Sequence, residues 1–100
     1  MNIAIESKVR AIDTGIDDHA SVGTFSLSVW QKTYDGRTRW LVRSDMGRSL
    51  IGEFDTEPEA IAAVGRELKQ IAERYEALAD EQLTRSRVLR EAAKRWEAES

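Results

Sequence analysis

Cysteine is absent from this 100-residue chain, which excludes disulfides, thiolate metal sites and cysteine nucleophiles. Histidine and proline occur once each, so imidazole can supply little acid–base chemistry at neutral pH. No stretch approaches the roughly 18 apolar residues of a membrane span. Residues 1–12 also lack the apolar run of a secretory signal. These absences predict a cytoplasmic protein that neither spans nor binds a membrane.

A single domain is predicted over residues 1–100, because separate hydrophobic cores need roughly 50 residues each. Apolar residues make up 41% of the chain and charged residues 33%, which is a globular composition. The net charge of −3 differs from the strongly basic balance of a general nucleic-acid binder. Residues 30–50 nevertheless hold five basic side chains and two acidic ones, so the middle of the chain has a net positive charge.

No arrangement of residues predicts catalysis. Asp17, Asp18 and His19 are three potential metal ligands in a row, but adjacent side chains point in different directions, which favours a solvated loop. No serine or threonine has a credible base partner beyond the single histidine, and the scattered glycines form no phosphate-binding loop. We therefore expect a non-catalytic protein without a metal or cofactor.

Residues 1–22 show two competing patterns. Four apolar residues recur at helical spacing: Ile5, Val9, Ile12 and Ile16. Ile3 and Ile5 alternate as in a strand. We expect a short helix in this N-terminal element, followed by a loop over residues 15–23.

Residues 24–54 predict a three-stranded antiparallel meander. Apolar residues alternate with serines over residues 25–29, which is the period of a strand. Asp35-Gly36 suits a two-residue hairpin turn, and Asp45-Met46-Gly47 suits a three-residue loop with Gly47 in the left-handed conformation. Residues 39–43 and 49–54 are then the second and third strands.

The two loop lengths predict which residues lie opposite one another. The expected cross-strand pairs are Val29–Val42, Trp30–Leu41, Val42–Leu50 and Leu41–Ile51. One face is then apolar and is expected to meet a helix; its members are Phe25, Leu27, Val29, Trp40, Val42, Leu50 and Phe54. A one-residue slip would reverse the faces, so burial of this face specifies the register.

Residues 57–98 read as helix. Thr56 and Glu59 form a capping box, and Pro58 is tolerated in the first turn. A seam of apolar residues follows at intervals of three and four: Ile61, Val64, Leu68, Ile71, Tyr75 and Leu78. The seam becomes polar at Gln82 and Arg85 and recovers at Leu89, Ala92 and Trp96.

One continuous helix of this length would overhang the sheet by roughly 40 Å. Either it breaks within residues 79–84, where Asp80 could cap a second helix, or the overhang pairs with another copy. We expect a homodimer whose self-association residues are Tyr75, Leu78, Leu89 and Trp96. The overall prediction is an α+β fold: a three-stranded antiparallel β-meander packed on one long C-terminal helix or helical hairpin, with a short N-terminal element.

The sheet face away from the helix is the predicted binding surface. It combines aromatic, apolar and basic side chains, as the centres of protein interfaces and nucleic-acid surfaces do. Its predicted partner-binding residues are Trp30, Lys32, Arg37, Arg39, Leu41 and Arg43. Alternatively, the N-terminal segment or the last helix covers this face and completes an ordinary core.

A resemblance to a known family begins at Trp40. The motifs Trp40-Leu41-Val42-Arg43, Gly47-Arg48, Gly52-Glu53-Phe54-Asp55-Thr56 and Glu59-Ala60 resemble the second half of the DNA-binding domain of plant ethylene-response factors. Phage integrase arm-binding domains share the plan of three strands and a helix. In both families the sheet face opposite the helix enters the DNA major groove. The resemblance implies that Trp30, Arg39 and Arg43 contact DNA.

In size and character the chain is also similar to small accessory proteins of phages. These include anti-CRISPR proteins, which bind and block RNA-guided surveillance complexes. We therefore expect a non-catalytic binding protein that occupies a surface on a larger protein or nucleoprotein complex, in the manner of a phage-type inhibitor of a host defence complex. The alternative is a DNA-binding module that uses the open sheet face.

Overall fold

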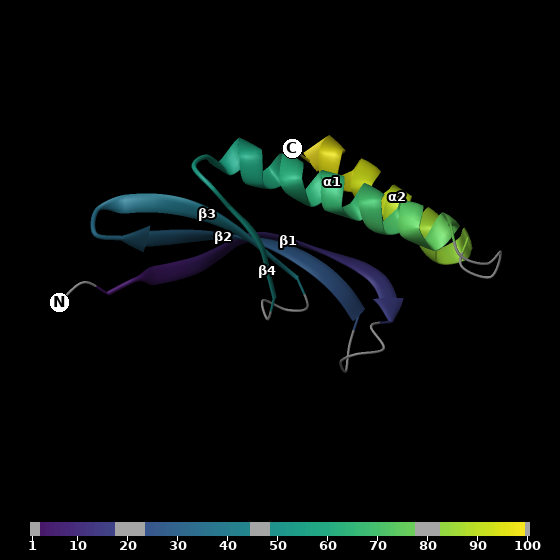
Figure 1. Ribbon diagram of the computed structural model, residues 1–100, viewed down its shortest axis with the longest axis horizontal. Helices are drawn as coiled ribbons and strands as arrows, with labels where there is room; N and C mark the ends of the chain where they lie inside the picture. The colour runs from purple at the N-terminus through teal and green to yellow at the C-terminus, as the bar shows by residue number, and fades with distance from the viewer. Residues whose placement is uncertain (1–2, 18–23, 45–48, 78–82, 100) are drawn as a thin grey trace.

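The computed structural model describes residues 3–17, 24–44, 49–77 and 83–99. These residues form a four-stranded antiparallel sheet, in the order β1-β2-β3-β4, with two helices on one of its faces (Figure 1). The elements are β1 (Ile5–Asp17), β2 (Thr24–Tyr34), β3 (Arg37–Ser44), β4 (Ser49–Phe54), α1 (Glu57–Glu76) and α2 (Leu83–Glu99). The predicted α+β class is confirmed, with one strand and one helix more than the simplest form of the prediction.

The N-terminal segment is a strand, so the predicted short helix is wrong. β1 lies antiparallel to β2, with Ile12 opposite Leu27 and Lys8 opposite Trp30. The register shifts between Lys8 and Arg10, which leaves Val9 as an extra residue. Because of this insertion, the positions on the face that the helices cover are odd-numbered before Val9 and even-numbered after it. The apolar residues Ile5, Val9 and Ile12 are therefore separated by four and three residues, as they would be in a helix.

The β2–β3 hairpin has the predicted turn and register. Asp35 and Gly36 both have positive φ, at 52° and 75°, which is the conformation that a two-residue turn of this kind requires. The predicted pairs Val29–Val42 and Trp30–Leu41 are confirmed.

The predicted β3–β4 register is wrong: neither Val42–Leu50 nor Leu41–Ile51 is a pair, and Leu41 lies opposite Glu53. Val42 lies opposite Gly52, and a register shift then places Leu50 opposite Arg43. Leu50 consequently lies on the face away from the helices and is 60% exposed. The predicted loop over residues 45–47 lies outside the described residues.

Gly52 allows the observed register because Phe54 fills the space beside it. A Cβ atom at Gly52 would lie 2.9 Å from the Phe54 ring, a distance that Cβ atoms essentially never show in proteins. Phe54 lies opposite Trp40, and both side chains pack against the core. The large side chain expected opposite Val42 is therefore supplied by Phe54 rather than by Leu50.

The two helices form the hairpin that was the alternative to one continuous helix. At the start of α1 the capping box is confirmed: the Glu59 backbone N–H donates to Thr56 Oγ1 at 3.4 Å, and this hydroxyl donates to Glu59 Oε1 at 3.0 Å. α1 ends at Glu76, and α2 begins at Leu83. Asp80 lies outside the described residues. Neither helix, over its described residues, has the length and hydropathy to cross a membrane.

Both helices and the sheet contribute to one core. Its buried members include Ile12, Leu27, Val29, Val42, Val64, Leu68, Leu89, Ala92 and Trp96. The Trp96 indole N–H donates to the Ile61 carbonyl at 2.7 Å, and the Arg10 guanidinium lies 3.9 Å from the centre of the Trp96 ring. Leu89 and Trp96 are thus buried within the chain, so they need no second copy to cover them. The side chain of Tyr75 and all of Leu78 lie outside the described part.

Candidate binding surface

In the described part of the chain, the helices cover one face of the sheet and leave the other uncovered. α1 and α2 pack on the same side, and no described helix or strand lies against the other (Figure 1). The N-terminal segment extends the sheet as β1 instead of covering this face, and α2 contacts β1 from the opposite side. We call the uncovered side the open face; its residues are Glu6, Lys8, Ala11, Asp13, Ser26, Ser28, Trp30, Lys32, Tyr34, Arg37, Arg39, Leu41, Arg43, Leu50 and Glu53.

Arg43 joins three strands across the middle of the open face. Its guanidinium carbon lies 5.0 Å from the centre of the Trp30 ring, and its Nη2 donates to both carboxylate oxygens of Glu6 at 3.0 Å. The Trp30 indole N–H donates to Ser28 Oγ at 2.8 Å, and this hydroxyl donates to the Arg43 carbonyl at 3.4 Å. Trp30 and Arg43 are therefore held in place by the chain's own hydrogen bonds and ion pair.

Leu41 is buried on the open face although no described helix or strand covers it. It lies between Trp30 on β2 and Glu53 on β4, and it is only 3% exposed. Leu41 supports the surface from beneath and is not available to touch a partner directly.

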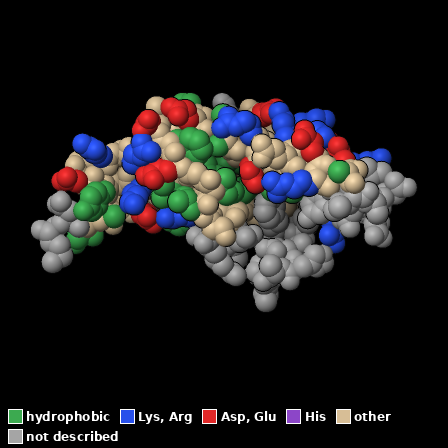
Figure 2. Space-filling model, in the orientation of Figure 1, with side chains coloured by type: hydrophobic (Ala, Val, Ile, Leu, Met, Phe, Trp, Pro, Cys, Tyr) green, Lys and Arg blue, Asp and Glu red, His purple; other side chains and the backbone are tan. Residues whose placement is uncertain are grey.

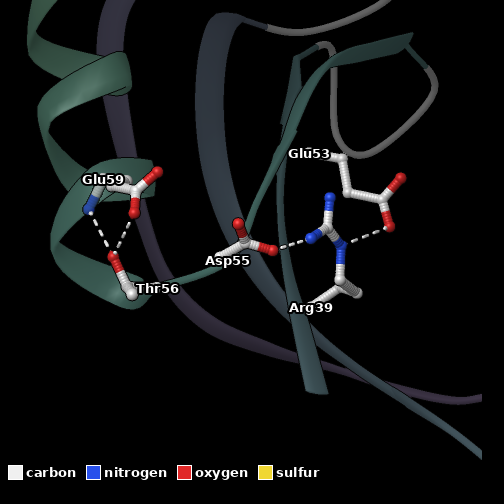
Figure 3. Close-up of polar contacts among 5 residues, drawn as sticks. All are labelled: Arg39, Glu53, Asp55, Thr56 and Glu59. Carbon is white, nitrogen blue, oxygen red and sulfur yellow. Dashed lines mark hydrogen bonds and ion pairs between the residues drawn. The ribbon is translucent and has the colours of Figure 1, made fainter. Parts of the chain in front are cut away.

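Arg39 links β3 to β4 and to the start of α1 (Figure 3). Its Nε lies 3.2 Å from Glu53 Oε1, and its Nη1 also pairs with the Asp55 carboxylate. Asp55 immediately precedes Thr56, the capping residue of α1. The two arginines on which the sequence prediction depended most are thus both occupied by carboxylates of the same chain.

Three other cations of the open face have no ion-pair partner among the described residues. They are Lys8, Lys32 and Arg37. Arg37 lies opposite the half-exposed Tyr34, next to the turn of the β2–β3 hairpin, and this hairpin projects beyond the helices (Figure 1). Lys8 was missed by the sequence reasoning because its segment was read as helix; the alternation of Ile3 and Ile5 was the signal for a strand.

The charge of the open face is mixed. Its five basic residues share the surface with Glu6, Asp13 and Glu53, and Asp55 lies beside them at the end of β4. Basic and acidic side chains are likewise interspersed over the side of the molecule that Figure 2 shows. Over the described residues, no three His, Cys, Asp or Glu side chains gather as metal ligands. Asp18 and His19 lie outside this part of the chain, as does the side chain of Asp17.

A shallow groove between the start of α1 and the end of α2 is a second surface feature, which the sequence did not indicate. It has a volume of about 530 Å³ and is lined by Glu57, Pro58, Ile61, Ala62, Gly65, Trp96 and Glu97. Among the described residues that line the groove, the two charged ones are both acidic. The open face therefore has the more varied set of side chains for recognition.

Comparison with known proteins found no matching family model, no similar curated protein and no similar solved structure. The function has to be inferred from the geometry of the open face.

Proposed function

We propose that this chain is a non-catalytic binding protein that uses the open face to occupy a surface on a larger protein or nucleoprotein complex. The observation that carries the proposal is the one-sided packing of the sheet. Both helices fill one face, while the opposite face holds an ordered Trp30–Arg43 pair under no described element. Tryptophan and arginine are the side chains most enriched among residues that dominate binding energy.

The structure supports different roles for the six predicted partner-binding residues. Trp30 offers the part of its ring that Arg43 does not cover, since its N–H is already bonded to Ser28. Lys32 and Arg37 offer charges with no described ion pair. Arg39, Arg43 and Leu41 keep the surface in shape through internal contacts. We add Lys8 and Tyr34 to the surface that meets the partner.

A protein surface is the favoured partner because the open face carries both signs of charge. The acidic residues Glu6 and Glu53 would repel the phosphates of a nucleic acid, so they disfavour a nucleic-acid partner. A DNA-binding module remains the alternative. The observation that favours it is that Lys8, Lys32 and Arg37 have no ion pair among the described residues. The similarity in size and character to phage inhibitors makes RNA-guided surveillance complexes the first purified partners to test.

The test compares surface variants with a matched control. Tagged chain captures its partner from extracts of the source cells, and the dissociation constant is then measured with the purified partner. Lys32→Glu/Arg37→Glu and Trp30→Ala are each expected to weaken binding by about tenfold or more, the range of important interface residues. Arg66→Glu/Arg87→Glu makes the same charge change at exposed helical positions and is expected to leave binding unchanged.

Reversal of Arg39 and Arg43 is a poorer test. Glutamate at these positions would face Glu6, Glu53 and Asp55 of the same chain, so lost binding could reflect a disturbed sheet. Equal affinity of wild type and Lys32→Glu/Arg37→Glu would contradict the use of the open face. A loss of about 10³-fold or more in affinity between 50 and 200 mM salt would instead identify nucleic acid as the ligand.

A further inference from the structure

β1 is an edge strand with exposed apolar side chains. One side of β1 pairs with β2, and no described segment pairs with its other side. Ile3, Ile5 and Val9 are 71%, 66% and 45% exposed, which is half of the large exposed hydrophobic residues of the described chain. An edge of this kind presents unpaired backbone N–H and C=O groups beside apolar surface and can pair with another strand.

Residues 5–8 are the part of this edge with regular geometry. Ile5, Glu6, Ser7 and Lys8 are in unbroken register with β2, before the shift at Val9. This part lies at the end of the sheet that projects beyond the helices (Figure 1). Beyond it, Arg10 bonds to the end of α2 and a second register shift follows Asp13. Bulges hinder an edge strand from pairing with another strand. The second half of β1 is therefore less able to pair with a further strand than the first half.

We propose that two copies of the chain associate through residues 5–9 of β1, paired antiparallel about a two-fold axis at Ser7. In this register Glu6 of each copy lies opposite Lys8 of the other, which gives two cross-strand pairs of opposite charge. Ile5 of each copy comes to the end of this pairing, next to Val9 of the other, so exposed apolar side chains gather at both ends. The pairing thus complements both the charge and the hydrophobic character of the edge.

Neighbouring registers are less favourable. An axis at Glu6 places this carboxylate opposite its own copy, and an axis at Lys8 does the same with two ammonium groups, which is destabilising. A slip of one residue places side chains of the covered face opposite those of the open face. The other edge strand, β4, has only six residues and one charged residue, Glu53, so it offers no such charge pairing.

The dimer would have one continuous eight-stranded sheet. Because the two-fold axis is perpendicular to the sheet, both helical hairpins lie on one side and both open faces on the other. The association uses the backbone edge of β1 and shares only Glu6 and Lys8 with the open face. Its tests measure self-association without a partner, so failure of the dimer and failure of the proposed function are distinguishable. If both hold, one dimer presents two binding surfaces side by side.

Cysteine cross-linking tests the geometry directly, because the chain has no cysteine of its own. Directly opposite residues of an antiparallel pair have Cβ atoms about 4.5–5.5 Å apart, close to disulfide range. Ser7→Cys is expected to form a covalent dimer under mild oxidation. Thr33→Cys is the matched control, because Thr33 is an exposed residue of the inner strand β2 and is expected to stay monomeric.

Charge exchange tests the register. Sedimentation equilibrium of the wild type is expected to show a mass that rises with concentration from 11.3 kDa towards twice that value. Lys8→Glu places two pairs of like charges in the dimer and is expected to weaken association about tenfold or more. Glu6→Lys alone has the same effect. An equimolar mixture of the two variants is expected to restore association, because the mixed dimer again pairs opposite charges.

Two results would overturn the proposal. One is a mass that stays at 11.3 kDa up to about 1 mM chain, where even a weak dimer is populated. The other is a dimer that Lys8→Glu leaves intact and that Ser7→Cys cross-links no faster than Thr33→Cys, since such a dimer uses another surface. Circular dichroism shows whether Glu6→Lys, which also loses its pair with Arg43, still folds.

Discussion

At the scale of single residues, the role of a charged side chain depends on whether it already has a partner within the chain. Arg43 was predicted as a donor to an external ligand, yet its Nη2 already bonds both oxygens of Glu6, and its side chain is mostly buried. Lys32, two residues from Trp30 on the same strand, has no described ion pair. Residues that the chain leaves unpaired are the better candidates for recognition, because binding need not first break an internal contact.

Val42 and Leu50 provide a test of the β3–β4 register. Val42 is fully buried beneath the helices, so Val42→Asp places a charge without a partner in the core. We expect it to lower the free energy of unfolding by about 3 kcal/mol or more, measured by urea denaturation. Leu50→Asp is the matched control and is expected to cost less than about 0.5 kcal/mol, because Leu50 is exposed beside Arg43. Equal losses would support the predicted register and contradict the observed one.

At the scale of elements, the helical hairpin is joined at its exposed side by an ion pair. Arg90 Nε of α2 lies 2.5 Å from Glu76 Oε1 of α1, and Arg90 Nη2 donates to Glu76 Oε2 at 2.9 Å. The hydrogen bond from Arg90 is the main cause that holds the pKa of Glu76 below its ordinary value, and it raises the pKa of Arg90 in turn. Charge attraction by Arg90 and a hydrogen bond from Ser86 also lower the pKa of Glu76, while desolvation opposes them.

This ion pair predicts a pH dependence of stability. Because the pKa of Glu76 is lower in the folded chain, its stabilising effect is present above the ordinary value of 4.5 and is lost as the pH falls through the folded value. Glu76→Gln is therefore expected to be less stable than wild type at neutral pH, with the difference vanishing in acid. Thermal unfolding over a pH series measures it. Glu67→Gln, which removes a charge without a described ion pair, is expected to show no such trend; an equal trend would contradict the prediction.

At the scale of the whole molecule, α2 completes a core that the sheet and α1 begin. Trp96 reaches from α2 to the Ile61 carbonyl of α1, and Arg10 of β1 stacks on its ring. Three elements that are distant in the sequence therefore meet at one side chain. We therefore expect the sheet and the hairpin to unfold as a single cooperative unit.

Trp96→Ala tests this cooperativity. Loss of the fully buried ring is expected to lower the free energy of unfolding by about 3–5 kcal/mol, as in other large-to-small core substitutions. Sheet and helix signals should still be lost together, which coincident fluorescence and far-UV circular dichroism transitions would show. Tyr34→Ala removes a half-exposed aromatic side chain and is expected to cost less than about 1 kcal/mol. Separate transitions for Trp96→Ala would contradict a single core.

Features that depend on neighbouring residues could be predicted from the sequence alone. The turn at Asp35-Gly36 has the required positive φ values, and the cap at Thr56 forms with Glu59. The β2–β3 register followed from the turn length, and it correctly placed Val42 in the core and Trp30 on the other face. These succeed because turn and cap chemistry act within a few residues and carry their register along the adjoining strands.

Features that depend on distant contacts were decided by packing. Two inserted residues, Val9 in β1 and Ile51 in β4, shift the alternation of their strands, and no local signal identifies them. The ion pair of Arg43 with Glu6 joins residues 37 positions apart, and it could not be foreseen while the N-terminal segment was read as helix. Burial of Trp96 likewise required α2 to fold back onto α1 and β1. Periodicity shows which residues prefer to be buried. Which surface buries them is decided only in the folded chain, because it depends on contacts between segments far apart in the sequence.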